Sequence, residues 1–198
     1  MSDEPRITRE STSEEEMRAA TLGDLVVHGT TIHLAEYDPE WPRLYDREAA
    51  RIRAVLGERV RRIEHVGSTA VPRLAAKPVI DIALAVPDST DEPSYVPDLE
   101  AAGYVLRIRE PDWYEHRMFK GPDTDIHLHT FSEGCIEIDR MTGFRDRLRT
   151  HDDDRALYER TKRDLAAREW RYIQHYADAK TGVVEAIIAR GRAAHDVP

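Results

Sequence analysis

Cysteine, lysine and long apolar runs are all scarce in this chain of 198 residues. Cys135 is the only cysteine, which excludes an internal disulfide and a metal cluster held by thiolates. No run approaches the roughly 20 apolar residues of a membrane-spanning helix. The polar, acidic N-terminal stretch is also unlike a signal peptide. We therefore expect a cytoplasmic protein without a membrane partner.

The charged residues are unevenly chosen. The formal net charge of −9 argues against broad binding of nucleic acid through its phosphate backbone. Of the 29 basic residues only four are lysines, namely Lys77, Lys120, Lys162 and Lys180. In a chain so rich in arginine, a lysine can mark a place that needs a compact point charge. Chance explains so small a set nearly as well.

Length and composition favour one folded domain with an appendage. Residues 1–25 are rich in Ser, Thr, Glu and Asp and predict a mobile acidic tail, with a helix around Glu14–Ala20 as an option. Residues 26–198 form the expected single domain.

Apolar spacing and turn residues predict the elements of this domain. Strands are expected over residues 31–37, 61–66, 79–86, 104–110, 113–120 and 126–131. Helices are expected over residues 39–56, 70–76, 97–102, 136–149, 155–169 and 179–194. In the first of these, Asp38 is the expected N-cap and Gly57 the end. The order predicts an α+β fold, with a mixed sheet, flanking helices and a helical C-terminal part.

The strand over residues 79–86 carries one carboxylate, Asp81. Its bulky apolar side chains fall on one face, whereas Asp81 shares the other face with small residues. An unpaired carboxylate there would be costly, so it must be solvated at a cleft, hydrogen-bonded or bound to a cation. A structural Asp satisfied by backbone N–H groups or by an arginine is the equally weighted alternative.

A turn of small residues, Gly67-Ser68-Thr69, precedes this strand. Backbone N–H groups and hydroxyls of such a turn can bind a phosphate. Lys77 lies beside the turn in sequence and is a further candidate for contact with a phosphate. A cation held by Asp81 could then bridge the protein and a triphosphate.

His127 and His129 fall on one face of the strand over residues 126–131. Two imidazoles at this spacing, together with Asp81, could hold a divalent metal. That donor set suits Mn²⁺, Fe²⁺ or Zn²⁺ better than Mg²⁺. The alternatives are two half-buried histidines bonded to their neighbours, or a pair that contacts an anionic ligand.

Three further side chains are candidates of lower specificity. Arg117 could clamp a phosphate, and a salt bridge to Glu115 or to a helix is its alternative. His65 fits a packed, structural histidine. Lys162 could face the site or cover its own helix, and the sequence does not decide between them.

Several segments together resemble the GrpB family, over about residues 31–190. The resemblance is carried by Tyr37–Pro42, Ile63–Pro72, Ala75–Ile82, Arg117, His127–His129, Phe144–Arg149, Tyr158 and Lys162. It implies the nucleotidyltransferase fold, in which a Gly-Ser turn binds phosphates and acids on neighbouring strands hold a divalent metal, Mg²⁺ or Mn²⁺. Asp81 would be the catalytic carboxylate. Active members of that superfamily usually carry a second acid two residues later, where this chain has Ala83.

Three functions are therefore considered. The first is a metal-dependent nucleotidyltransferase that binds a nucleotide or a small phosphorylated ligand. The second is a nucleotide-binding accessory module that has lost catalysis, which the missing acid favours. The third is a metal-dependent hydrolase that uses Asp81, His127 and His129.

Overall fold

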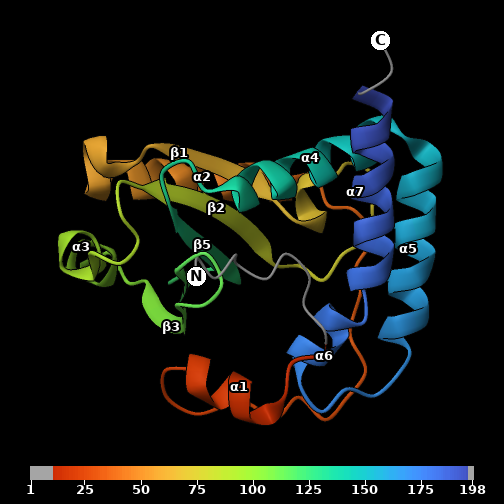
Figure 1. Ribbon diagram of the computed structural model, residues 1–198, viewed down its shortest axis with the longest axis horizontal. Helices are drawn as coiled ribbons and strands as arrows, with labels where there is room; N and C mark the ends of the chain where they lie inside the picture. The colour runs from red at the N-terminus through yellow and green to blue at the C-terminus, as the bar shows by residue number, and fades with distance from the viewer. Residues whose placement is uncertain (1–10, 196–198) are drawn as a thin grey trace, which may run out of the picture.

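The computed structural model describes residues 11–195 and confirms an α+β fold with a mixed sheet and flanking helices (Figure 1). The sheet has five strands in the order β1-β2-β5-β4-β3. β2 and β5 are parallel, and every other neighbouring pair is antiparallel. The strands are β1 (Arg62–Val66), β2 (Ile80–Val86), β3 (Val105–Glu110), β4 (His116–Lys120) and β5 (Ile126–Ser132).

Alternation along β2 gives the sheet two different faces. Ile80, Ile82 and Leu84 are almost completely buried in the main core, beneath α2 (Glu40–Leu56) and α3 (Val96–Ala101). The opposite face carries Asp81 at the beginning of the strand and small residues after it. There Ala83 and Ala85 pack with Phe131 and Ile138. α4 (Ile136–Thr150) thus covers one part of this second face and leaves the part around Asp81 uncovered.

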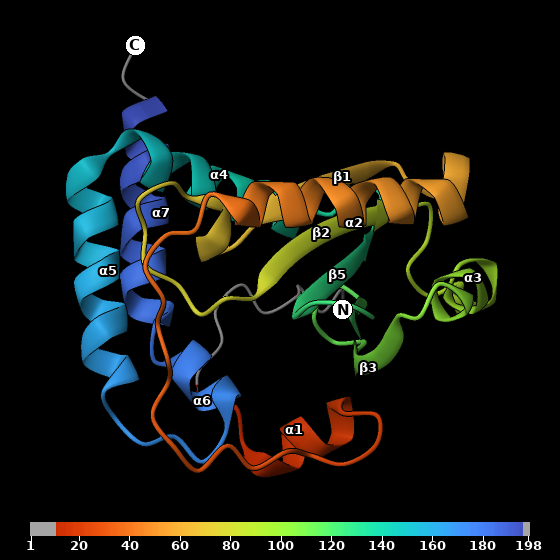
Figure 2. The same ribbon diagram turned by 180° about the vertical axis from the view of Figure 1, so that it is seen from behind.

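The C-terminal part is helical, as expected, with α5 (Asp152–Ala166), α6 (Ile173–Asp178) and α7 (Thr181–His195). α5 and α7 lie side by side at one end of the molecule in both views (Figures 1 and 2). The sequence did not predict α6. No helix among residues 11–195 is long and apolar enough to cross a membrane.

Two expected elements are absent from the described residues. Residues 31–37 form no strand, because Thr30 and Ala35 make isolated bridges to two different partners, Trp170 and Ala76. Residues 70–76 form no α-helix. A short 3-10 turn over Ser68–Ala70 is followed by Arg73 at φ 65°, a left-handed conformation that interrupts a helix.

Two predicted element starts are also shifted. β4 begins at His116 because Tyr114 and Glu115 have positive φ values, so Trp113 and Glu115 lie in a turn. Pro39 is the N-cap of α2, although the Asp38 carboxylate still accepts a hydrogen bond from the Glu40 N–H. Gly57 ends this helix at φ 55°, as expected.

The described part of the N-terminal segment, residues 11–25, contains the helix that the sequence allowed there and contacts the rest of the domain. α1 (Glu14–Ala20) is present, and its Met17 is buried. The Thr12 N–H donates to Asp178 in α6, and the Leu22 N–H donates to the Arg107 carbonyl in β3. α1 therefore lies against the folded body, across the sheet from α2 (Figure 2). Residues 1–10 lie outside the described residues.

Candidate metal and phosphate site

The uncovered part of the second sheet face borders a cavity of about 1040 Å³. One wall is the polar face of the sheet, with Asp81, His127 and His129. The opposite walls come from the N-terminal segment with α1 and from α6. The cavity therefore lies between elements that are far apart in the sequence.

The structure brings Asp81, His127 and His129 together on the two parallel strands β2 and β5. Asp81 lies opposite His127 in the register, and His129 lies opposite Ala83. Asp81 Oδ1 is 3.3 Å from His127 Nδ1 and 3.6 Å from His129 Nε2. One ligand atom from each residue lies within 4.8 Å of the other two. Ligands about 2.1 Å from a shared ion lie about 3.4 Å apart at tetrahedral angles, so the three side chains fit a divalent metal.

Gly67 makes room for the Asp81 carboxylate. Its φ is 71°, and a Cβ built on it would lie 2.3 Å from Asp81 Oδ2. Any other residue here would combine a strained backbone with a steric clash. The glycine of the turn thus allows the close approach of β1 to the carboxylate.

A relay of side chains orients His129. Glu110 Oε2 lies 2.7 Å from His116 Nδ1, and His116 Nε2 lies 3.0 Å from His129 Nδ1. The Glu110 carboxylate accepts, so a neutral His116 donates from Nδ1 and accepts at Nε2 from the His129 Nδ1–H. His129 Nε2 then faces Asp81 with its lone pair when a cation lies between them, and with a proton donated to the carboxylate when none does. A lone pair beside a carboxylate is unfavourable unless a cation lies between them, and such outer carboxylate–imidazole relays commonly orient metal ligands.

The electrostatics of the three side chains fit the same interpretation. Burial acts to raise the pKa of Asp81, but the neighbouring His127 and His129 outweigh it and hold that pKa far below its usual range. Burial lowers the pKa of His127, against the pull of the Asp81 charge. A carboxylate that stays charged beside a neutral imidazole is a suitable pair of donors for a cation.

Ser68 lies at the edge of this site and is held by a buried lysine. Lys162 Nζ, on α5, donates a hydrogen bond to Ser68 Oγ at 3.1 Å and another to the Ala75 carbonyl. Lys162 is only 2% exposed. The structure therefore settles the question that the sequence left open, because Lys162 faces the Gly-Ser turn.

Thr69 is turned away from the cavity's centre by its own hydrogen bonds. Its hydroxyl donates to the Val79 carbonyl at 3.0 Å and accepts from His65 Nε2 at 3.1 Å. His65 stacks on Tyr45 at 4.8 Å, and its burial lowers its pKa to about 4. His65 is a packed structural residue, as expected, and the Thr69 hydroxyl is already used.

All four lysines of the chain line this one cavity. Lys120 pairs with Asp125 at 2.8 Å. Among residues 11–195, no carboxylate lies within ion-pair distance of Lys77, Lys162 or Lys180. Burial lowers the pKa of each of these three, to about 7 for Lys162 and about 8 for Lys180. Lys162 is buried, and Lys77 and Lys180 are half-buried. Cations without an acid in such positions are costly, and an anionic ligand would offset that cost.

Arg117 is the one predicted site residue that the structure places elsewhere. It lies opposite Thr130 in the register, on the sheet face away from His129. Its guanidinium pairs with Glu92 at 2.6 Å and donates to the Glu115 carbonyl. The salt bridge, which was the alternative for this residue, is what the structure shows, although its acid is Glu92.

Sequence reasoning missed Glu110, His116, Tyr176 and Lys180 as neighbours of the site. Glu110 is the last residue of β3, and His116 is the first residue of β4. Only the pairing of these strands with each other and with β5 shows that the two side chains reach His129. For Lys180 a signal was present, since it was one of only four lysines.

Comparisons with known proteins agree on one family. The family model described as GrpB protein matches residues 31–190. A UPF0157 protein of Halalkalibacterium halodurans is 61% identical over 181 residues, which are 91% of this chain and 93% of that protein. A UPF0157 protein of Streptomyces coelicolor is 46% identical over 82% of this chain and 86% of that protein. The crystal structure of the conserved protein GrpB from Enterococcus faecalis matches with a TM-score of 0.72 at 27% identity, over 82% of this chain and 99% of that chain.

Proposed function

The chain belongs to the GrpB family, and we propose that its cavity binds a nucleotide or another small phosphorylated ligand together with a divalent metal. The observation that carries the proposal is the meeting, in one cavity, of a three-residue metal donor set with all four lysines. The donor set suits a cation, and the lysines suit the phosphates that such a cation commonly bridges.

Each group has a distinct role in this proposal. Asp81, His127 and His129 would hold the metal, which would neutralise phosphate charge when bound. The Ser68 hydroxyl and the ammonium groups of Lys77 and Lys162 would contact phosphate oxygens. Two imidazoles among three donors favour Mn²⁺ over Mg²⁺.

Nucleotidyl transfer is the reaction that this arrangement would support. An acceptor oxygen would form a bond to the α-phosphorus while the bond to the pyrophosphate breaks, and pyrophosphate would leave. The unpaired lysines would stabilise the charge on the leaving group.

A binding module without catalysis is the second candidate, and Ala83 favours it. Ala83 follows Asp81 on the same strand face and is fully buried, so no second carboxylate lies there. The adjacent position on β5 is His129, which supplies an imidazole where a two-metal enzyme would need an acid. Loss of the second acid predicts tight binding without turnover.

The test is a calorimetric titration of ATP, GTP, CTP and UTP into the untagged protein, with Mg²⁺ and then with Mn²⁺. We expect metal-dependent binding of at least one nucleotide, stronger with Mn²⁺, that is lost in Asp81→Ala. Release of pyrophosphate with an added acceptor would identify a transferase, and binding without product would identify a module. Absence of binding with either metal would contradict the proposal. A hydrolase would instead require a tightly held transition metal, which metal analysis of protein purified without chelator would detect.

A further inference from the structure

Two tyrosine–lysine pairs with the same spacing lie at the cavity near α5 and α6, and Lys162, Tyr176 and Lys180 of these pairs line it. Lys162 Nζ lies over the ring of Tyr158 at 4.9 Å, and Lys180 Nζ lies over the ring of Tyr176 at 4.2 Å. In each pair the lysine follows its tyrosine by four residues. Within α5 this spacing places Tyr158 and Lys162 on the same side of the helix, whereas Lys180 lies just after the end of α6. Each ring contacts its ammonium by a cation–π interaction. Lys162 uses two of its N–H donors on Ser68 and the Ala75 carbonyl and keeps one for another partner.

The two lysines are close enough to repel each other. The positive charge of Lys180 lowers the pKa of Lys162, in addition to the larger effect of burial. Lys162 is 2% exposed, and among residues 11–195 neither lysine has a carboxylate within ion-pair distance. Lys180 is half-buried. Two such ammonium groups without an ion-paired acid are unfavourable unless an anion lies between them.

A third polar group on the same wall lacks a partner. The Tyr176 hydroxyl is buried and makes no hydrogen bond among the described residues. Tyr176 is 3% exposed and lines the cavity. Buried hydroxyls nearly always have a partner, so this one indicates a ligand atom within its reach.

This wall is connected to the metal site through the Gly-Ser turn. Lys162 donates to Ser68 Oγ at 3.1 Å, and the preceding residue, Gly67, abuts the Asp81 carboxylate. A ligand that contacts both the metal site and Lys162 therefore passes the turn. A chain of two or three phosphoryl groups offers anionic oxygens to each of the groups along this path.

We propose that Lys162, Lys180 and the Tyr176 hydroxyl form a subsite for the second and third phosphoryl groups of the ligand. This inference rests on the proposed function and names its substrate class. The site takes nucleoside diphosphates or triphosphates, or an inorganic polyphosphate, in preference to monophosphates. None of these three groups is one of the proposed metal ligands, so the subsite acts on the phosphate chain whether or not a metal is bound.

The test uses the full chain in the presence of chelator, with orthophosphate, pyrophosphate and tripolyphosphate as probes. We expect tripolyphosphate to bind at least about tenfold more tightly than orthophosphate to the unmodified protein, since it adds charge-assisted hydrogen bonds. Lys162→Met and Lys180→Met each keep an apolar stem and should reduce this preference to about threefold or less. Tyr176→Phe should reduce tripolyphosphate affinity about three- to tenfold, with little change for orthophosphate.

Arg160→Met is the matched control. Arg160 is exposed on α5 and does not line the cavity, so its loss removes one positive charge without touching the subsite. This variant should keep the preference for tripolyphosphate. Equal affinity for the three anions, or the same loss in Arg160→Met as in the lysine variants, would overturn the subsite. Failure of Mn²⁺ to bind would instead count against the metal site alone, because the anion series contains no metal.

Discussion

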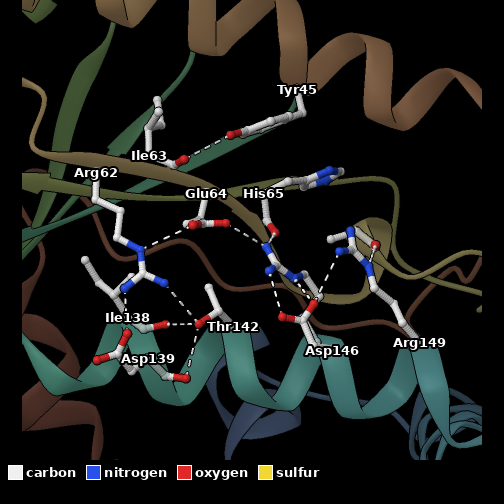
Figure 3. Close-up of polar contacts among 12 residues, drawn as sticks. Tyr45, Arg62, Ile63, Glu64, His65, Ile138, Asp139, Thr142, Asp146 and Arg149 are labelled. Carbon is white, nitrogen blue, oxygen red and sulfur yellow. Dashed lines mark hydrogen bonds and ion pairs between the residues drawn. The ribbon is translucent and has the colours of Figure 1, made fainter.

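The contact between β1 and α4, which we call the β1–α4 seam, and the cavity beneath the sheet differ in whether their cations are paired with acids. In the seam every cation has an acid (Figure 3). Arg62 pairs with Asp139 at 2.5 Å and with Glu64 at 3.2 Å, and Arg145 pairs with Glu64 at 2.9 Å. Arg145 also donates to the His65 carbonyl at 2.8 Å. The seam is thus a closed network between two elements.

The cavity is lined by all four lysines, and three of them lack an acid among residues 11–195, whereas Arg109 in the same lining pairs with Glu92 at 2.5 Å. Arginine presents a rigid fork that matches a fixed carboxylate, whereas lysine is a compact charge on a flexible stem. Cations that are paired with acids in this molecule therefore maintain the structure, and cations without an acid are available to a ligand. Four changes test that contrast.

The largest effect is expected from Asp81→Ala. Removal of the only carboxylate among the three metal donors should weaken Mn²⁺ binding by more than about 100-fold, beyond what outer-shell changes cause. The far-ultraviolet circular dichroism spectrum should stay unchanged, since β2 keeps its apolar face. Manganese binding is measured by electron paramagnetic resonance. Should the variant unfold, Asp81 is a structural residue and the site argument fails.

Gly67→Ala should act on the same carboxylate from the neighbouring turn. The added Cβ would lie 2.3 Å from Asp81 Oδ2 at a positive φ, so the carboxylate must move. We expect at least about tenfold weaker Mn²⁺ binding and a loss of about 1–2 kcal/mol of stability. Gly143→Ala is the control, because this glycine lies on α4 with nothing within 4 Å of its built Cβ. It should gain about 0.5–1 kcal/mol. Equal effects at the two glycines would refute the proposed role of Gly67.

The variants Arg145→Met and Lys162→Met compare the effect on stability of losing a paired cation with the effect of losing an unpaired one. The first removes the donor to Glu64 Oε2 and to the His65 carbonyl, and should lower the free energy of unfolding by about 1–3 kcal/mol. The second removes a buried cation that has no acid, which is favourable, together with its hydrogen bonds to Ser68 and the Ala75 carbonyl, which is unfavourable. The free energy of unfolding should therefore change by less than about 1 kcal/mol. Chemical denaturation at neutral pH measures both. A larger loss in Lys162→Met than in Arg145→Met would reverse the assignment of the two regions.

The smallest effect concerns pH. The ordinary pKa of lysine is about 10.4. Burial lowers the pKa of Lys162 to about 7; the charges of Lys180 and Arg163 act in the same direction, and the charge of Glu159 opposes them. Between these values the unfolded chain binds more protons than the folded protein, so stability rises with pH above about 7, by at most about 1.4 kcal/mol per unit. From pH 7 to 9 the unmodified protein should gain about 1–2 kcal/mol more than Lys162→Met, as denaturation at each pH will show. A parallel pH dependence in the two proteins would contradict the buried charge.

Much of the fold could be predicted from the sequence because alternation and turn residues are local signals. Most elements lie close to their expected positions, namely β1, β2, β3, β5 and four of the helices. The expected strand faces are also observed for Asp81, His127 and His129. The strand over residues 31–37 was wrong because alternation does not reveal whether a partner strand exists.

The site was predicted less completely, for a related reason. The displacement of Arg117 follows from the register of β4 against β5, and the true start of β4 depends on two residues at positive φ. The positions of His116 and Lys180 depend on long-range packing. Only the scarcity of lysine hinted that the lysines gather at one cavity.

A crystal structure with Mn²⁺ and a non-hydrolysable nucleoside triphosphate would show whether the cavity binds the metal and the phosphate chain together. The account predicts an anomalous manganese peak bound by Asp81, His127 and His129, with the phosphate chain extending past Ser68 toward Lys162 and Lys180. Manganese bound elsewhere, or phosphates held by the arginines of the β1–α4 seam with the lysines untouched, would contradict it.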